Sequence, residues 1–88
     1  MMVLEMVPAA LSTEITNELK TCHTIGIGAG IDCSAQVLVL YDMLGIYSGK
    51  KARFMRNFMI GATSIEEAVA NYVRSVKTGE FPAPEHAF

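Results

Sequence analysis

The carboxylate with the most distinctive position in the sequence is Glu5, which directly follows the apolar run Met1 to Leu4. A continuous apolar run of this kind is typical of a strand that is buried on both faces of a parallel sheet. A carboxylate at the carboxyl end of such a strand can act as a general base. Glu5 could instead cap the helix that we expect to begin near Pro8, or it could pair with a cation. Its position alone leaves these interpretations open.

A glycine-rich segment, TIGIGAG at residues 24–30, is the second stretch that could do chemistry. A dinucleotide site needs the spacing G-x-G-x-x-G and a helix that begins there, but Gly26, Gly28 and Gly30 are followed by Ile31. No Gly-Lys-Ser/Thr ending follows, and we expect a strand next. The spacing therefore argues against a Rossmann or P-loop site. The glycines either allow close packing and a tight turn, or form one wall of an active site at a strand end.

Three further titratable residues are weaker candidates. Asp42 ends an expected third strand as Glu5 ends the first. It could likewise be functional or structural, and the structural interpretation is favoured. His23 lies between an expected helix and a strand, on the side of a barrel away from the chemistry. His86 lies in a tail that we expect to be extended. We expect structural placement for His23.

Composition excludes several classes of function. The chain has 88 residues, a net charge of −2 and one short basic cluster, at 50–56, which we expect to be a solvated helix face. Nucleic-acid binding needs a basic stripe, so we expect none. Cys22 and Cys33 lack metal-site or disulfide spacing, and no apolar run approaches the roughly 18 residues of a membrane span. Without a signal peptide pattern, we expect a cytoplasmic protein with free thiols.

Hydrophobic patterning predicts an α/β protein. The chain is 51% hydrophobic, which favours apolar surface that is buried against more protein over a tight monomer. Ser64 and Glu67 predict a capping box, and Gly79 predicts the end of the helix that they begin. Parallel pairing is expected between the first two strands, and a fragment of a closed (β/α) barrel fits better than a complete domain. The expected strands are 1–4, 23–30 and 36–40, and the other expected helices are 8–20 and 51–58.

The segments VLEMVP, TIGIGAG, QVLVLYDMLGI and GEFPAPEHAF, in this order, resemble the C-terminal third of the ketopantoate hydroxymethyltransferase family. The resemblance runs over essentially all of the chain. It implies that residues 1–88 form a single partial-barrel domain with about strands six to eight of a (β/α)8 TIM barrel and their helices. That barrel belongs to the phosphoenolpyruvate/pyruvate superfamily. It also implies assembly into large homo-oligomers.

The resemblance also implies an activity in pantothenate biosynthesis. Family members transfer a hydroxymethyl group from methylenetetrahydrofolate to 3-methyl-2-oxobutanoate, a 2-oxo acid, with magnesium holding the substrate. Glu5 matches the glutamate of the family's E-x-V-P motif, which accepts the C3 proton. The metal ligands and the lysine and serine that contact the oxo acid lie in the family's first two-thirds. We therefore expect no metal ligand in this chain, and no activity from it alone.

The sequence departs from the family pattern at three places. Ser34-Ala35 replaces an Asp-Gly, Tyr41 replaces a histidine before Asp42, and Met6 stands where a cysteine is common. Losing the glycine could force a different turn if its φ is positive, and Tyr41 puts contacts on the folate side in doubt. A non-catalytic remnant or association module is the alternative function. A phosphate-binding half-barrel that uses residues 26–30 is a third.

Overall fold

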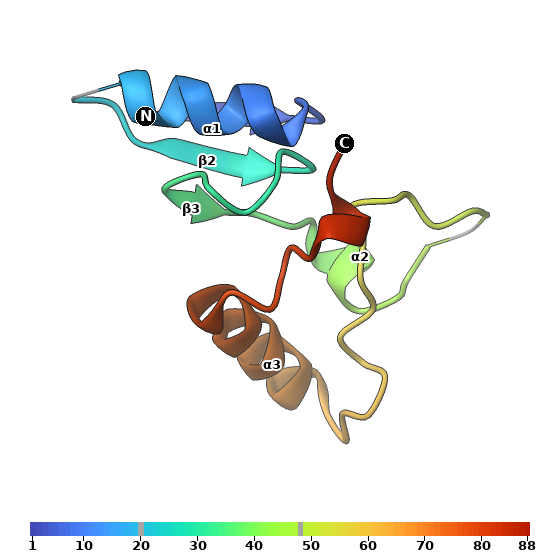
Figure 1. The fold of residues 1–88 in the computed structure, drawn as a ribbon. Coiled ribbons are helices and arrows are strands. Elements are labelled where there is room, and N and C mark those ends of the chain that lie inside the picture. The colour runs from blue at the N-terminus through green and yellow to red at the C-terminus, as the bar shows by residue number, and fades with distance from the viewer. Residues whose placement is uncertain (20, 48) are drawn as a thin grey trace.

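The computed structural model describes residues 1–19, 21–47 and 49–88, so Lys20, the last residue of the predicted 8–20 helix, lies outside the described residues. The α/β class is confirmed, since three parallel strands form one sheet in the order β1-β2-β3. Figure 1 labels β2 and β3 beside the helix α1. The elements in chain order are β1 (Met2–Glu5), α1 (Ala9–Glu18), β2 (Thr24–Ile27), β3 (Ala35–Gln36), α2 (Leu40–Met43), α3 (Ile65–Thr78) and the 3₁₀ helix η1 (Pro84–His86).

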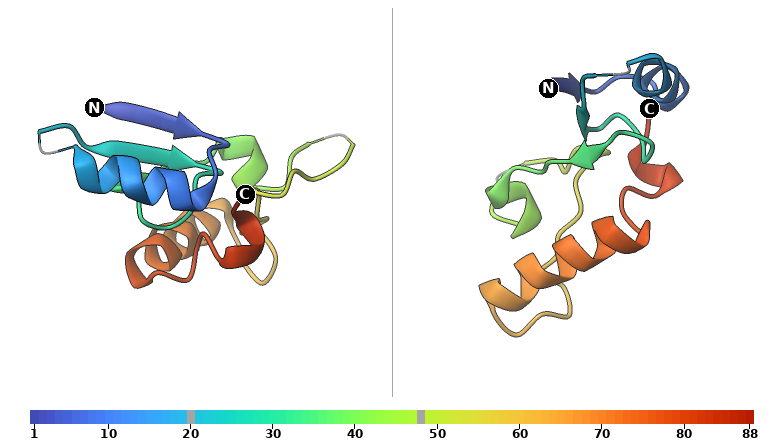
Figure 2. Two further views of the ribbon diagram at one scale, coloured as in Figure 1. Left: turned by 45° about the horizontal axis from the view of Figure 1, so that its top comes forward. Right: turned by 90° about the vertical axis from the view of Figure 1, so that its left-hand side faces the viewer.

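The predicted parallel pairing of the first two strands is confirmed. Met2 pairs with Thr24 and Glu5 with Ile27, so the two strands end together at one carboxyl edge. The connecting helix α1 lies along one face of the sheet (Figure 2). Leu4 is buried beneath it, but Val3 is 60% exposed, so the prediction that β1 is buried on both faces is wrong for this chain. Successive strand residues point to opposite faces, and α1 covers only one of them.

The last helix, α3, follows its local signals closely. The Ser64 hydroxyl accepts a hydrogen bond from the Glu67 N–H at 3.1 Å, and Gly79 ends the helix with a φ of 84°. The second half of the predicted capping box is absent, since the Glu67 carboxylate accepts from the Thr63 hydroxyl at 2.7 Å instead. Two apolar residues of α3, Ile65 and Val73, are exposed.

The predicted strand 36–40 is wrong beyond Gln36. The Val37 N–H still donates to the Gly26 carbonyl at 2.9 Å, but the chain then leaves the sheet and α2 begins at Leu40. Burial explains the change, because Leu38 packs against α2 and α3 rather than continuing along the sheet. Alternating apolar residues predict a strand without showing which neighbours they pack against.

The predicted helix 51–58 is also wrong, because this segment consists of turns and irregular backbone. A helix would bond the Phe58 N–H to residue 54, but here it donates to the Met43 carbonyl at 2.7 Å. This long-range bond holds Phe58 in the core. The tail, predicted to be extended, forms η1 at its end, where the Ala87 N–H donates to the Pro84 carbonyl.

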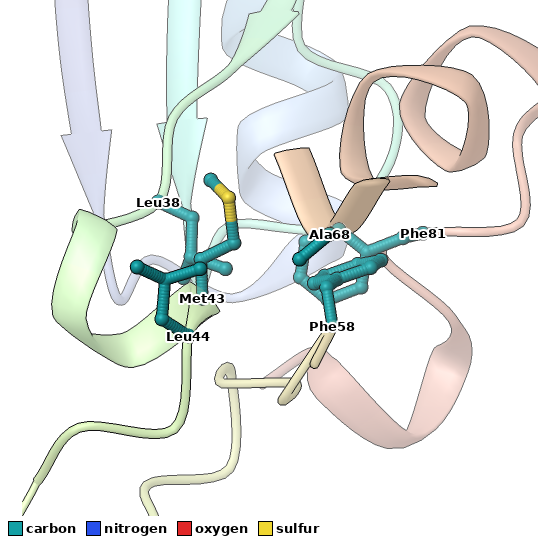
Figure 3. Packing of buried hydrophobic residues seen from close by; sticks show 6 residues of the cluster. All are labelled: Leu38, Met43, Leu44, Phe58, Ala68 and Phe81. Carbon is teal, nitrogen blue, oxygen red and sulfur yellow. The ribbon is translucent and has the colours of Figure 1, made fainter. Parts of the chain in front are cut away.

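Two hydrophobic clusters hold the molecule together. The larger lies between α2, α3 and the segment around Phe58, and Figure 3 shows its buried residues. Its aromatic rings meet edge to face, with Phe58 centred 5.4 Å from both Tyr72 and Phe81. Such pairs add about 0.5–1.5 kcal/mol each beyond burial. The smaller cluster joins α1 to the sheet, and its buried members are Leu4, Ala29 and Cys33.

Candidate active site

The carboxyl edge of the sheet presents Glu5 to solvent. Glu5 is the last residue of β1, and the next N–H, that of Met6, donates to the Ile27 carbonyl at 2.8 Å. The backbone on both sides of Glu5 is therefore held in the ladder. Among the described residues no hydrogen bond or ion pair occupies the Glu5 carboxylate, so it neither caps α1 nor forms a salt bridge within residues 1–19, 21–47 and 49–88. Glu5 is therefore an exposed carboxylate at a fixed backbone position.

Met6 turns the chain sharply after Glu5. Its φ of 53° lies in the left-handed region, where a side chain costs about 1–2 kcal/mol relative to glycine. This turn ends β1 and sends the chain towards Pro8 and α1. Strained positions of this kind cluster at active sites, and this one directly follows the candidate base.

The glycines after β2 pack closely against residues from distant parts of the chain. A Cβ on Gly28, whose φ is 65°, would lie 3.2 Å from both Phe54 and Phe88. A Cβ on Gly30 would lie 2.7 Å from the Cβ of Ala9. These contacts agree with the packing interpretation, and the interpretation as one wall of an active site stays a prediction. No helix begins in the described backbone directly after Gly30, so a phosphate site at a helix N-terminus is not formed there.

The last residues of the chain return to this edge of the sheet (Figure 2). The main-chain oxygen of Phe88 accepts from the Ala9 N–H at 3.1 Å, and the Arg53 guanidinium lies 4.8 Å from the centre of the Phe88 ring. Phe54 and Phe88 thus form an aromatic wall beside the end of β2. Sequence spacing contains no signal for this wall, since its residues come from segments far apart.

A buried hydroxyl network lies at the opposite, amino edge of the sheet. Thr24 is fully buried; its Oγ1 accepts from the Ser34 N–H at 3.0 Å and lies 2.8 Å from the Thr16 Oγ1. In return, the Thr24 N–H donates to the Ser34 Oγ at 3.1 Å. Ser34 therefore joins β2 to the start of β3, while α1 contributes through Thr16. Residue spacing alone did not predict this network.

The residues that depart from the family pattern lie in a turn, at the start of β3 and on a short helix. Met6 is the only non-glycine residue with positive φ in the described ranges, so Ala35, the first residue of β3, does not enter the left-handed region. Asp42 lies in the first turn of α2, so the prediction that it ends a strand is wrong. Tyr41, its neighbour, is exposed on the same helix.

The two histidines occupy different environments. His23 is exposed just before β2, at the amino edge away from Glu5. His86 is only 8% exposed, and its Nδ1 accepts from the Ala83 N–H at 3.0 Å. Burial lowers the pKa of His86; Glu85 opposes this shift, while Lys51 and Arg56 add to it. His23 therefore lies at the edge of the sheet opposite Glu5, and the ring of His86 is held in the tail by burial and by its bond to Ala83.

The described residues contain neither a metal-ligand cluster nor a membrane-spanning helix. Within residues 1–19, 21–47 and 49–88, no three side chains of the metal-binding types His, Cys, Asp and Glu come together. In the same ranges, no helix is long and apolar enough to cross a membrane. Cys22 and Cys33 are free thiols.

Comparison with known proteins identifies the family. The family model described as ketopantoate hydroxymethyltransferase matches residues 1–84. The chain is 73% identical over its whole length to a 3-methyl-2-oxobutanoate hydroxymethyltransferase of Nitrosospira multiformis, covering 33% of that relative. Identity to the enzymes of the same name from Aromatoleum aromaticum and Nitrosomonas eutropha is 64% and 65%, again over all 88 residues and 32% of each. The chain thus spans about a third of the length of these relatives, and it belongs to the ketopantoate hydroxymethyltransferase family.

Proposed function

We propose that this chain is the C-terminal third of a 3-methyl-2-oxobutanoate hydroxymethyltransferase, which makes ketopantoate for pantothenate biosynthesis. The observation that carries the proposal is 73% identity over the whole chain to a relative with that name. The one-carbon donor would be methylenetetrahydrofolate and the acceptor the 2-oxo acid. Completed subunits would then assemble into homo-oligomers.

Residues 1–88 would form one partial-barrel domain, with β1, β2 and β3 as strands six to eight of a (β/α)8 barrel. Three observations support this arrangement. The strands are parallel and follow one another in sheet order, as in a barrel. β1 and β3 each pair on one side only within the described sheet, and Val3 leaves an apolar face of β1 open. The remaining strands of a barrel would cover these edges and this face.

Glu5 would act as the general base. Barrel enzymes place their chemistry at the carboxyl edge of the strands, where Glu5 is exposed and forms no bond to the described residues. Its carboxylate would accept the C3 proton of the 2-oxo acid, leaving the carbanion equivalent that attacks the one-carbon unit. The ladder around Met6 and Ile27 would hold the carboxylate in place. Proton transfer by a positioned base contributes about 10²–10⁴ in rate.

Magnesium, which the family resemblance implies, does not fit the residues of this chain alone. At the end of β1 the described structure presents one carboxylate, Glu5, and no three potential ligands meet anywhere in the described ranges. Magnesium prefers several oxygen ligands in octahedral geometry. We therefore propose that the ligands come from the part of the enzyme outside these 88 residues, and that the chain by itself is inactive.

A chimera tests the proposed function. Residues 1–88 replace the matching segment of the Nitrosospira multiformis relative, and ketopantoate formation is measured with 3-methyl-2-oxobutanoate and methylenetetrahydrofolate. We expect activity within about tenfold of the intact relative, and none from the 88-residue chain alone. A folded chimera that makes no ketopantoate, beside an active relative, would show that this segment no longer supports catalysis.

A second candidate, a non-catalytic association module, is favoured by the exposed apolar side chains. Val3 is 60% and Ile60 81% exposed, and Val39 and Leu40 are also exposed. Such surface drives association when it forms contiguous patches. Light scattering after size exclusion, combined with the chimera, distinguishes the two candidates. Self-association of the chain together with an inactive chimera favours the association module. An active chimera favours the enzyme.

A further inference from the structure

A cavity away from the strand-end residues has a concentrated positive charge. It has a volume of about 350 Å³ and lies between the irregular segment after Gly49 and the helix α3. Three of its lining residues are cationic, namely Lys51, Arg56 and Arg74, whereas Glu80 is its one acidic lining residue in the described structure. None of the proposed catalytic residues lines it. Lys51 and Arg56 belong to the basic cluster at 50–56, which the sequence alone predicts to be a solvated helix face. The helix 51–58 does not form.

The cationic groups are held in position from within the molecule. The Arg56 guanidinium lies 4.7 Å from the centre of the Phe58 ring, which is itself buried in the larger cluster. Arg74 donates to the Oδ1 of Asn71, one turn earlier on α3. The Asn57 Oδ1 accepts from the Met59 N–H at 2.9 Å. Both amide oxygens in the lining are therefore already occupied, and the groups left to face a ligand are mainly N–H donors.

The cationic lining residues of the cavity outnumber its one acidic lining residue in the described structure. Among residues 1–19, 21–47 and 49–88, no carboxylate lies within 4.0 Å of the charged nitrogens of Lys51, Arg56 or Arg74. The positive charges of Lys51 and Arg56 also lower the pKa of His86, although burial is the main cause of that shift. A concave surface lined mainly by one sign of charge concentrates counter-ions. An anion is the ligand that this electrostatic arrangement favours.

We propose that this cavity binds a small organic dianion, a phosphate monoester or a dicarboxylate, through Lys51, Arg56 and Arg74. Arginine donates two parallel hydrogen bonds to either group. Phe58 and Ile60 supply an apolar wall for the carbon skeleton, and the volume of about 350 Å³ suits a molecule at the small end of ligand size. Glu80 can accept a hydrogen bond from a ligand hydroxyl, although its charge opposes binding of any anion.

Calorimetric titration of the 88-residue chain at low salt tests this site. The probes are inorganic phosphate, glycerol 3-phosphate, succinate and, as an uncharged control, glycerol. We expect saturable millimolar or tighter binding of at least one organic dianion, weaker binding of inorganic phosphate and none of glycerol. The affinities for glycerol 3-phosphate and succinate show whether the site prefers a phosphate monoester or a dicarboxylate. No saturable binding of any anion at 20 mM, a chosen upper concentration, would overturn the proposal.

Variants separate a built site from general attraction. Arg56→Gln and Arg74→Gln should each weaken binding about tenfold, since a charge-assisted hydrogen bond is lost. The matched control is Arg53→Gln, because Arg53 is exposed and stacks on Phe88 outside the cavity. An equal loss of affinity in all three variants would indicate non-specific attraction by positive charge and would contradict the proposed site. Glu80→Gln keeps all the cations of the cavity and should tighten binding of the anion. If an arginine variant does not fold, the Glu80→Gln chain still tests the site, because unchanged or weaker binding by it overturns the proposal.

Discussion

Glu5 and Ile27 are register partners at the carboxyl ends of β1 and β2, and the hydrogen bond from the Met6 N–H to the Ile27 carbonyl closes the ladder just beyond them. This pairing places the candidate base beside the glycine turn that follows β2. β1 thus supplies a carboxylate that has no partner among the described residues, and the segment after β2 supplies a compact turn beside it.

Replacing Glu5 by glutamine in the chimera should abolish most of the activity and leave the fold intact. An exposed side chain without partners contributes little to stability, whereas loss of a general base lowers kcat by about 10²–10⁴. Steady-state kinetics and circular dichroism measure the two effects. Glu14→Gln, on an exposed position of α1, is the matched control and should retain activity. Comparable kcat values for the two variants would remove Glu5 from the mechanism.

Gly28→Ala should destabilise the chain by about 2–4 kcal/mol. The positive φ costs about 1–2 kcal/mol for any side chain, and the crowding against Phe54 and Phe88 adds to it. Urea unfolding followed by circular dichroism gives the free energy. Gly61→Ala is the control, since Gly61 has a φ of 84° but no atom within 4 Å of the position that a Cβ would take. If both variants lose the same free energy, packing at Gly28 contributes nothing.

Thr24→Val should cost about 1–3 kcal/mol, because valine keeps the shape but leaves the Ser34 N–H without its buried acceptor. Chemical denaturation again reports the loss, and hydrogen exchange of the Ser34 amide should become faster. Thr21→Val, at an exposed position three residues earlier, should be near neutral. A Thr24→Val chain as stable as the parent would show that the hydroxyl network is dispensable.

Stability should fall as the pH is lowered below about 6.5, because of His86. Burial is the main cause of its lowered pKa, so the native state favours the neutral ring while the unfolded chain titrates near 6.5. Between these two pKa values the unfolded state binds more protons, and stability therefore decreases as the pH falls. Protonation would also remove the Nδ1 acceptor from the Ala83 N–H.

Unfolding free energies at pH 7.5 and 5.5, two chosen test conditions, measure this dependence. His86→Gln should flatten the pH profile, whereas His23→Gln, at an exposed position, should leave it as in the parent chain. A profile that is equally steep in the His86 variant would assign the effect to other groups.

Local signals in the sequence were enough to predict several elements. α3 has a hydroxyl N-cap at Ser64 and a glycine stop at Gly79, and both act within a few residues of the helix they bound. The apolar run before Glu5 and the one before the glycines predicted β1 and β2 and their parallel pairing. The order of motifs indicated the family, and the apolar run alone was enough to place Glu5 at a strand end.

Tertiary contacts decided the rest. The run 36–40 leaves the sheet because Leu38 finds its burial against α2 and α3, and the helix 51–58 does not form because the Phe58 N–H bonds to the Met43 carbonyl. The cationic cavity likewise combines residues from the segment around Arg56 with residues of α3. Short-range patterns determine elements whose hydrogen bonds and caps are local. Where the partners of a segment are distant in the chain, only the folded structure shows which of the competing contacts form.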